Sequence, residues 1–94
     1  EPADYITVAR KAKGSDNWFV GGKCDEQGHT AVVTLDFLDK GRQYDCTIYA
    51  DAKDAHYETN PQAYVITRKR VKAGQKLKLQ EAPGGGFAMS LIAQ

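Results

Sequence analysis

The spacing of the apolar runs constrains this sequence most strongly. Short stretches that alternate apolar and polar residues are separated by turn-forming residues about every ten positions. No stretch shows the i, i+3, i+4, i+7 apolar repeat of an amphipathic helix. The short connections favour antiparallel pairing, because parallel neighbours need long crossovers. The pattern therefore predicts an all-β fold, an antiparallel β-sandwich of about seven to eight strands, in a single domain spanning residues 1–94.

The alternation also places the strands and their inner faces. We expect strands at residues 5–13, 18–24, 29–35, 44–50, 64–71 and 76–80, and a last strand beginning near residue 87. The side chains expected to form the structural core are Trp18, Val20, Tyr44, Ile48, Leu77, Leu79, Phe87, Met89 and Leu91. Phe37 and Leu38 are expected to close one end of this core. Gly21 and Gly22 are expected to weaken the second strand, or to mark a bulge or a close backbone approach there.

Length and charge exclude several classes of function. A chain of 94 residues buries only about two thirds of its unfolded surface, so its core is thin and leaves little room for a deep cleft. The net charge of +1 lacks the basic excess of a nucleic-acid binder. The basic cluster Arg68, Lys69, Arg70 and Lys72 is better explained as the solvated face of a strand. Because no apolar run is long enough to span a bilayer, we also expect no membrane insertion.

Residues capable of catalysis or metal binding do not form a recognisable constellation. His29 and His56 have no Cys or His at the spacing of a zinc site, so we expect both to be structural or surface residues. The run Gly84–Gly86 lacks the Lys-Ser/Thr pair of a phosphate-binding loop. Carboxylates are numerous enough for a glycosidase pair, but such a pair needs a cleft that a thin core does not provide.

The longest connection is dense in oxygen-bearing side chains: Asp51, Asp54, Glu58 and Asn60. Such groups could hold calcium. Their spacing matches no EF-hand, and hydrogen bonds within turns explain them better. We therefore expect no metal in this chain.

Two cysteines and several aromatic residues leave alternatives open. A disulfide between Cys24 and Cys46 would be sterically allowed if their strands faced each other across the sandwich. Two free thiols that pack as small apolar side chains are the favoured interpretation. Tyr57, in a polar connection, and Tyr49 are candidates for contact with a sugar ring, whereas Trp18 is expected to be structural.

Several segments in a fixed order resemble one known family. The segments are residues 5–10, 17–21, 25–26, 35–38, 44, 48–49, 54–57, 60–61, 64–66 and 82–88. They include the runs Asn17-Trp18-Phe19-Val20-Gly21 and Ala82-Pro83-Gly84-Gly85-Gly86-Phe87-Ala88. In this order and spacing the chain resembles, over nearly its whole length, the C-terminal domain of glycoside hydrolase family 97.

The resemblance implies a larger parent enzyme. Members of the family combine an N-terminal β-sandwich, a catalytic (β/α)8 barrel and this C-terminal β-sandwich, and they hydrolyse α-glucosides or α-galactosides. The family's hydrolysis uses a bound calcium ion, which is expected in the parent's catalytic domain. The parent is expected to be a periplasmic or otherwise exported bacterial protein. None of the family's catalytic motifs occurs in this sequence, so no catalytic residue is carried over. The start at Glu1-Pro2 instead of Met is consistent with an excised piece.

The resemblance makes this chain a non-catalytic accessory domain without a cofactor of its own. Its expected partners are the catalytic barrel of the same parent chain and other copies in a homo-oligomer. A carbohydrate-binding module, with carbohydrate as partner, is the alternative, and an independent enzyme has only the abundant carboxylates in its favour. A domain that rests on a partner should expose an apolar patch, which we expect near Tyr5 and its strand neighbours.

Overall fold

The computed structural model describes residues 5–24, 29–51, 64–81 and 85–94. Within these ranges the chain forms seven strands and no helix. The strands are β1 (Tyr5–Lys11), β2 (Trp18–Cys24), β3 (His29–Thr34), β4 (Gln43–Asp51), β5 (Tyr64–Lys72), β6 (Lys76–Glu81) and β7 (Gly86–Ala93). Every pair of neighbouring strands is antiparallel, which confirms the predicted all-β sandwich.

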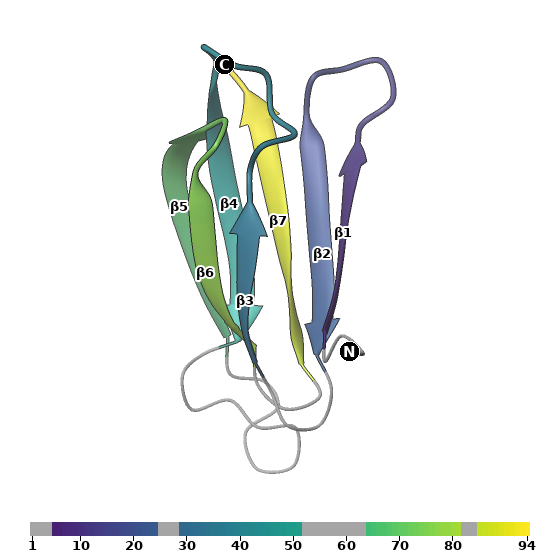
Figure 1. Cartoon of the computed structure of the whole chain (residues 1–94), viewed down its shortest axis with the longest axis vertical. Coiled ribbons are helices and arrows are strands. Elements are labelled where there is room, and N and C mark those ends of the chain that lie inside the picture. The colour runs from purple at the N-terminus through teal and green to yellow at the C-terminus, as the bar shows by residue number, and fades with distance from the viewer. Residues whose placement is uncertain (1–4, 25–28, 52–63, 82–84) are drawn as a thin grey trace.

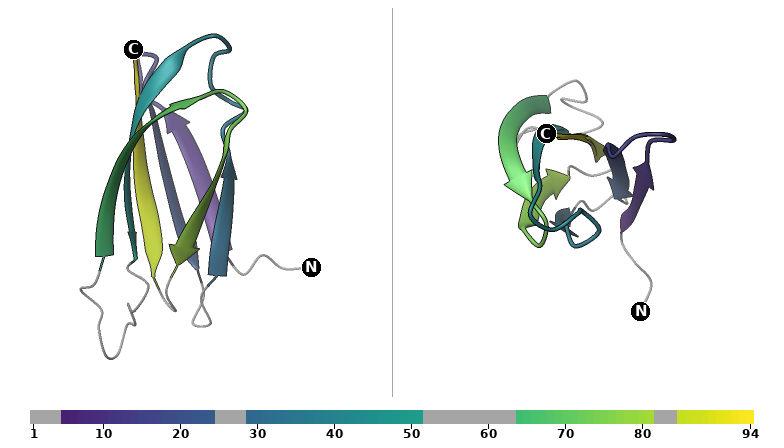
Figure 2. Two further views of the ribbon diagram at one scale, coloured as in Figure 1. Left: turned by 90° about the vertical axis from the view of Figure 1, so that its left-hand side faces the viewer. Right: turned by 90° about the horizontal axis from the view of Figure 1, so that it is seen from above.

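The strands form two layers of unequal width (Figure 1). A large sheet has five strands in the order β1-β2-β7-β4-β5, and a small sheet pairs β3 with β6. The small sheet lies across the large one, so that β6 contacts β4 and β7 while β3 contacts β1. Figure 2 shows the large sheet curving around the small one. Such curvature follows from the right-handed twist of the strands.

The core lies between the small sheet and the three middle strands of the large sheet. Val20, Met89 and Ile48 lie opposite one another on β2, β7 and β4, and all three are buried. Leu77 and Leu79 of β6 complete the core from the other layer. Eight of the nine expected core residues are buried, and the ninth, Trp18, is partly buried and packs against the others.

The small sheet is too narrow to cover the two outer strands of the large sheet. Thr7 and Ala9 of β1 are exposed, although the register places them on the same face as the buried Val20. Thr67 and Lys69 of β5 are exposed for the same reason. Most of each edge strand therefore lies beside the core, as the view from above in Figure 2 shows for β1. β5 contributes one fully buried side chain, Val71, at the level of Tyr44.

Hydrogen bonds fix the connections at one end of the sandwich. The hydroxyl of the fully buried Tyr44 accepts a hydrogen bond of 3.1 Å from the backbone N–H of Asp39, in the connection that also buries Leu38. In the turn from β5 to β6, Gly74 has a φ of 90°, a left-handed value that favours glycine. Its N–H donates to the carbonyl of Leu35 at 2.8 Å, which holds the turn against the end of β3.

Candidate interaction surface

The side of the large sheet that faces away from the core carries a row of residues without charge. Val8, Gly21, Ala88, Tyr49 and Ile66 lie opposite one another on β1, β2, β7, β4 and β5 in that order. They point outward because they alternate with buried neighbours on β2, β7 and β4. The row therefore crosses the entire sheet, one residue from each strand.

Two further apolar side chains extend this row. Phe19 is two positions from Gly21 on β2, and Ile92 is on β7, both on the same outward face. We call the seven residues together the apolar face. Its large side chains are strongly exposed: Phe19 49%, Val8 47%, Tyr49 45%, Ile66 43% and Ile92 37%. Contiguous exposed apolar residues on this scale mark interaction sites, since single exposed ones are common but clusters are not.

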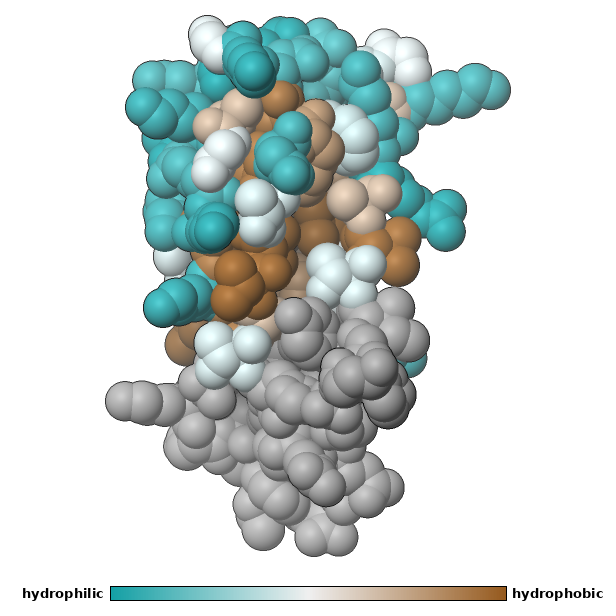
Figure 3. Space-filling model, in the orientation of Figure 1, coloured by the Kyte–Doolittle hydropathy of each residue, from teal (hydrophilic) through white to brown (hydrophobic). Residues whose placement is uncertain are grey.

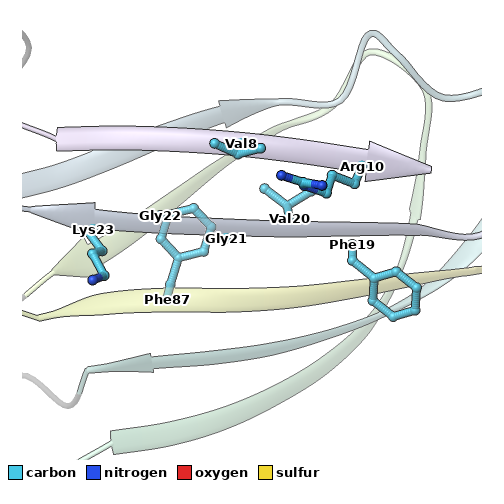
Figure 4. A pocket seen from close by; sticks show the side chains of 8 residues that line it. All are labelled: Val8, Arg10, Phe19, Val20, Gly21, Gly22, Lys23 and Phe87. Carbon is cyan, nitrogen blue, oxygen red and sulfur yellow. The ribbon is translucent and has the colours of Figure 1, made fainter. Parts of the chain in front are cut away.

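A hollow interrupts the apolar face at Gly21. Its volume is about 590 Å³, and Figure 4 shows the residues that line it: Val8, Arg10, Phe19, Val20, Gly21, Gly22, Lys23 and Phe87. Five of these eight belong to the outward-facing set of β1 and β2. A Cβ added to Gly21 would meet only the backbone oxygen of Phe87, at 3.8 Å. The hollow exists because glycine leaves the place of a side chain empty between Val8 and Ala88.

Basic side chains surround the apolar face. Arg10 and Lys23 lie beside the hollow, and Arg68 and Arg70 lie on β5 at the opposite margin. The Arg70 guanidinium donates to the Asp45 carboxylate at 2.7 Å. Both groups are more than half exposed, so this pair contributes little to stability. The edges of the apolar face therefore carry more positive than negative charge. This charge attracts or repels any partner that approaches the face.

The outward side of the small sheet has a different character. Val32 is its only large apolar side chain that is exposed among the described residues, and Lys78 lies opposite it. Thr30, Thr34 and Lys76 are its exposed neighbours. Figure 3 views the molecule from this side and shows hydrophilic surface along the upper and left margins around a central apolar area. Among the described residues, the apolar face exposes five large apolar side chains and the outward side of the small sheet exposes Val32.

Across the described ranges, no group of three or more His, Cys, Asp or Glu side chains is placed to hold a metal ion. Those ranges also contain no helix long and apolar enough to cross a membrane. Burial raises the pKa of the Cys46 thiol to about 11, so this cysteine is a neutral thiol at ordinary pH and a poor nucleophile.

The structure describes some of the candidate residues that the sequence suggested, and others lie outside the described ranges. Tyr49 lies in the apolar face, between Ala88 and Ile66. The side chains of His29 and Asp51 lie outside the described residues, as do Asp54, His56, Tyr57, Glu58 and Asn60 altogether. The side chain of Tyr5 is likewise outside them, but Val8 of the same strand belongs to the apolar face.

The register of the large sheet argues against a bridge between the two cysteines. Cys46 of β4 is opposite Leu91 of β7, and Leu91 is opposite Trp18 at the start of β2. Cys46 and Trp18 are therefore at the same position along the strand direction. Cys24 is at the other end of β2, six residues or about 20 Å further along. A disulfide requires the two Cα atoms within about 7 Å. The buried Cys46 is free, which confirms the favoured interpretation for this cysteine and rules out the alternative disulfide.

Most of the apolar face was not predicted from the sequence. The missed signal is that β2 and β4 each contain adjacent apolar residues, Phe19 beside the buried Val20 and Tyr49 beside the buried Ile48. Two apolar neighbours in a strand point to opposite faces, so one of them must leave the core.

Comparisons with known proteins agree on one family. The family model described as glycosyl-hydrolase 97 C-terminal, oligomerisation, matches residues 1–92. A retaining alpha-galactosidase of Bacteroides thetaiotaomicron is 36% identical over 88 residues, which are 94% of this chain and 12% of that protein. Two solved structures of a glycoside hydrolase family 97 enzyme from Pseudoalteromonas sp. strain K8, one in complex with acarbose and one a variant in complex with panose, are each 38% identical with a TM-score of 0.92. The match covers 97% of this chain and 14% of each of theirs.

Proposed function

We propose that this chain, which belongs to the glycosyl-hydrolase 97 C-terminal, oligomerisation family, is a non-catalytic module that joins copies of a larger glycoside hydrolase. The observation that carries the proposal is the apolar face, an exposed surface that crosses all five strands of the large sheet. A subunit contact needs a surface of this kind, because burial of apolar area is the main driving force of association.

The parent enzyme is a further part of the proposal. The chain spans only 12% of the curated relative and 14% of the solved relatives, so their activities belong to much longer proteins. A retaining alpha-galactosidase and an enzyme in complex with acarbose support an α-galactoside or α-glucoside as the parent's substrate. Packing of this domain on the parent's catalytic barrel, calcium in that barrel and export to the periplasm are proposed from the family resemblance alone.

The geometry supports carbohydrate binding less well than it supports association between copies of the chain. A sugar site combines an aromatic ring with polar side chains that orient the hydroxyl groups. Tyr49, the described candidate, has Ala88 and Ile66 as its neighbours across the sheet, and neither offers a polar side chain. Thr47, Ser90 and Arg68 lie one row further along the same face. The residues directly opposite Tyr49 suit an apolar partner surface better than a sugar.

Sedimentation equilibrium of the 94-residue chain tests the proposal. We expect reversible self-association between about 10 µM and about 1 mM, in the range typical of weak interfaces. A chain that stays monomeric throughout this range would contradict the oligomerisation role. In parallel, nitrophenyl α-glucosides and α-galactosides should not be hydrolysed, and turnover that disappears when a carboxylate pair is replaced would show an independent enzyme.

A further inference from the structure

We propose that the apolar face binds the same face of a second copy, with Phe19 of each copy seated in the hollow above Gly21 of the other. This inference rests on the proposed function, since it names the surface and the contact through which copies join. The family description gives association but assigns no residues to it.

The shape of the apolar face suits a second copy of itself. Phe19 protrudes with 49% of its surface exposed, and the hollow above Gly21 lies two residues away on the same face of β2. A two-fold interface uses one patch on both subunits, so it requires a protrusion and a matching depression on the same surface. The apolar face provides both. A two-fold axis between the copies would place the Phe19 ring of each copy in the hollow of the other.

The size of the face sets the strength of the contact. Strands of seven residues are roughly 23 Å long, and five strands are roughly 24 Å wide, so the whole outer side of the large sheet has a flat area of roughly 550 Å² per copy, of which the apolar face is a part. Specific interfaces of standard size bury about 800 Å² on each partner. The face alone therefore supports a weak dimer, in which loss of one central aromatic anchor should have a large effect.

The charges around the hollow distinguish this partner from others. Arg10 and Lys23 beside the hollow would approach the same groups of the second copy, and salt screens such repulsion. Association of two copies should therefore strengthen when the salt concentration rises from about 50 mM to about 500 mM. An acidic partner surface elsewhere in a longer chain would bind more weakly at the higher salt concentration.

Three variants test the contact in the 94-residue chain. Phe19→Ser removes the protruding ring, and Gly21→Leu fills the hollow while leaving Phe19 in place. The space around Gly21 accepts a side chain, because only one backbone atom comes within 4 Å of its added Cβ. Val32→Ser is the matched control, since Val32 is 45% exposed but lies on the small sheet. Circular dichroism melting shows that each variant is folded.

The sedimentation results separate the inference from the proposed function. We expect Phe19→Ser and Gly21→Leu each to raise the dimer dissociation constant at least roughly tenfold, and Val32→Ser to leave it unchanged within about twofold. If the wild-type chain associates and both face variants associate equally well, the contact assigned here is wrong and the oligomerisation role stands. If the wild-type chain does not associate at all, the proposed function itself fails. Weakening by Val32→Ser alone would move the interface to the small sheet.

Discussion

Trp18 and Phe37 pack together with their ring centroids 4.6 Å apart and their planes inclined at 51°. Trp18 begins β2 in the large sheet, and Phe37 lies in the connection between β3 and β4. Two aromatic rings that pack at this separation and tilt stabilise the fold by more than the burial of their apolar area alone. The pair thus links the large sheet to the connection that closes one end of the core.

Replacement of Trp18 by alanine should destabilise the fold. Complete burial would make the loss about 3–5 kcal/mol. Because Trp18 is only partly buried, we expect about 2–4 kcal/mol, measured as the free energy of unfolding in urea. Phe19→Ala is the control on the next residue, where an exposed side chain should cost less than about 0.5 kcal/mol in the monomer. Equal losses for the two variants would refute the assignment of Trp18 to the core.

Gly86 and Gly21 should respond differently to alanine. A Cβ on Gly86 would collide with the backbone oxygen of Gly22, on the neighbouring strand β2, and that backbone has no flexible side chain to move aside. We expect Gly86→Ala to lower the free energy of unfolding by about 1–3 kcal/mol. Gly21→Ala meets only ordinary contact at 3.8 Å and should be neutral within about 0.5 kcal/mol. Thermal melts that rank the two variants in the opposite order would contradict the described register of β2 and β7.

Cys46 should make the fold sensitive to alkaline pH. Burial raises the pKa of its thiol from 9.0 to about 11, so the unfolded chain loses this proton at lower pH than the folded chain. The contribution to stability is therefore complete below pH 9 and is lost as the pH rises toward 11. We expect the free energy of unfolding to fall by up to about 2 kcal/mol more in the wild-type chain than in Cys46→Ala over this interval.

Urea titrations at several pH values measure this difference, and comparison with Cys46→Ala cancels the contribution of the other titrating groups. Parallel curves for the two proteins would show that the Cys46 thiol titrates as it does in the unfolded chain. The same burial predicts that a thiol reagent labels Cys46 only after unfolding, which can be followed in a Cys24→Ser variant so that a single thiol reports.

The strands could be predicted from the sequence because their signal is local. The alternation of Tyr44, Cys46, Ile48 and Ala50 shows the inner face of β4 directly, since every second side chain points to the same side. The close backbone approach predicted from the glycine pair in the second strand occurs at Gly22, which lies against Gly86. Each of these predictions depends on a few neighbouring residues.

The apolar face could not be predicted in the same way, because it depends on strand order. Val8 and Ile66 are 58 positions apart in the sequence and join one row only through β2, β7 and β4. The hollow likewise needs Gly21 to lie beside Val8 and Ala88, which the register decides. The sequence alone also left the position of Cys24 relative to Cys46 open, and the register resolves it.

Concentration-dependent amide chemical shifts of the 94-residue chain measure the interface most directly. A dilution series from about 1 mM to about 10 µM changes the fraction of dimer without any substitution. We predict that the shifts that change with concentration cluster at Val8, Phe19, Gly21, Ala88 and Tyr49, while those of Val32 and Lys78 on the small sheet stay constant. Changes confined to the small sheet, or none at any concentration, would contradict the assignment of the apolar face as the surface that joins two copies.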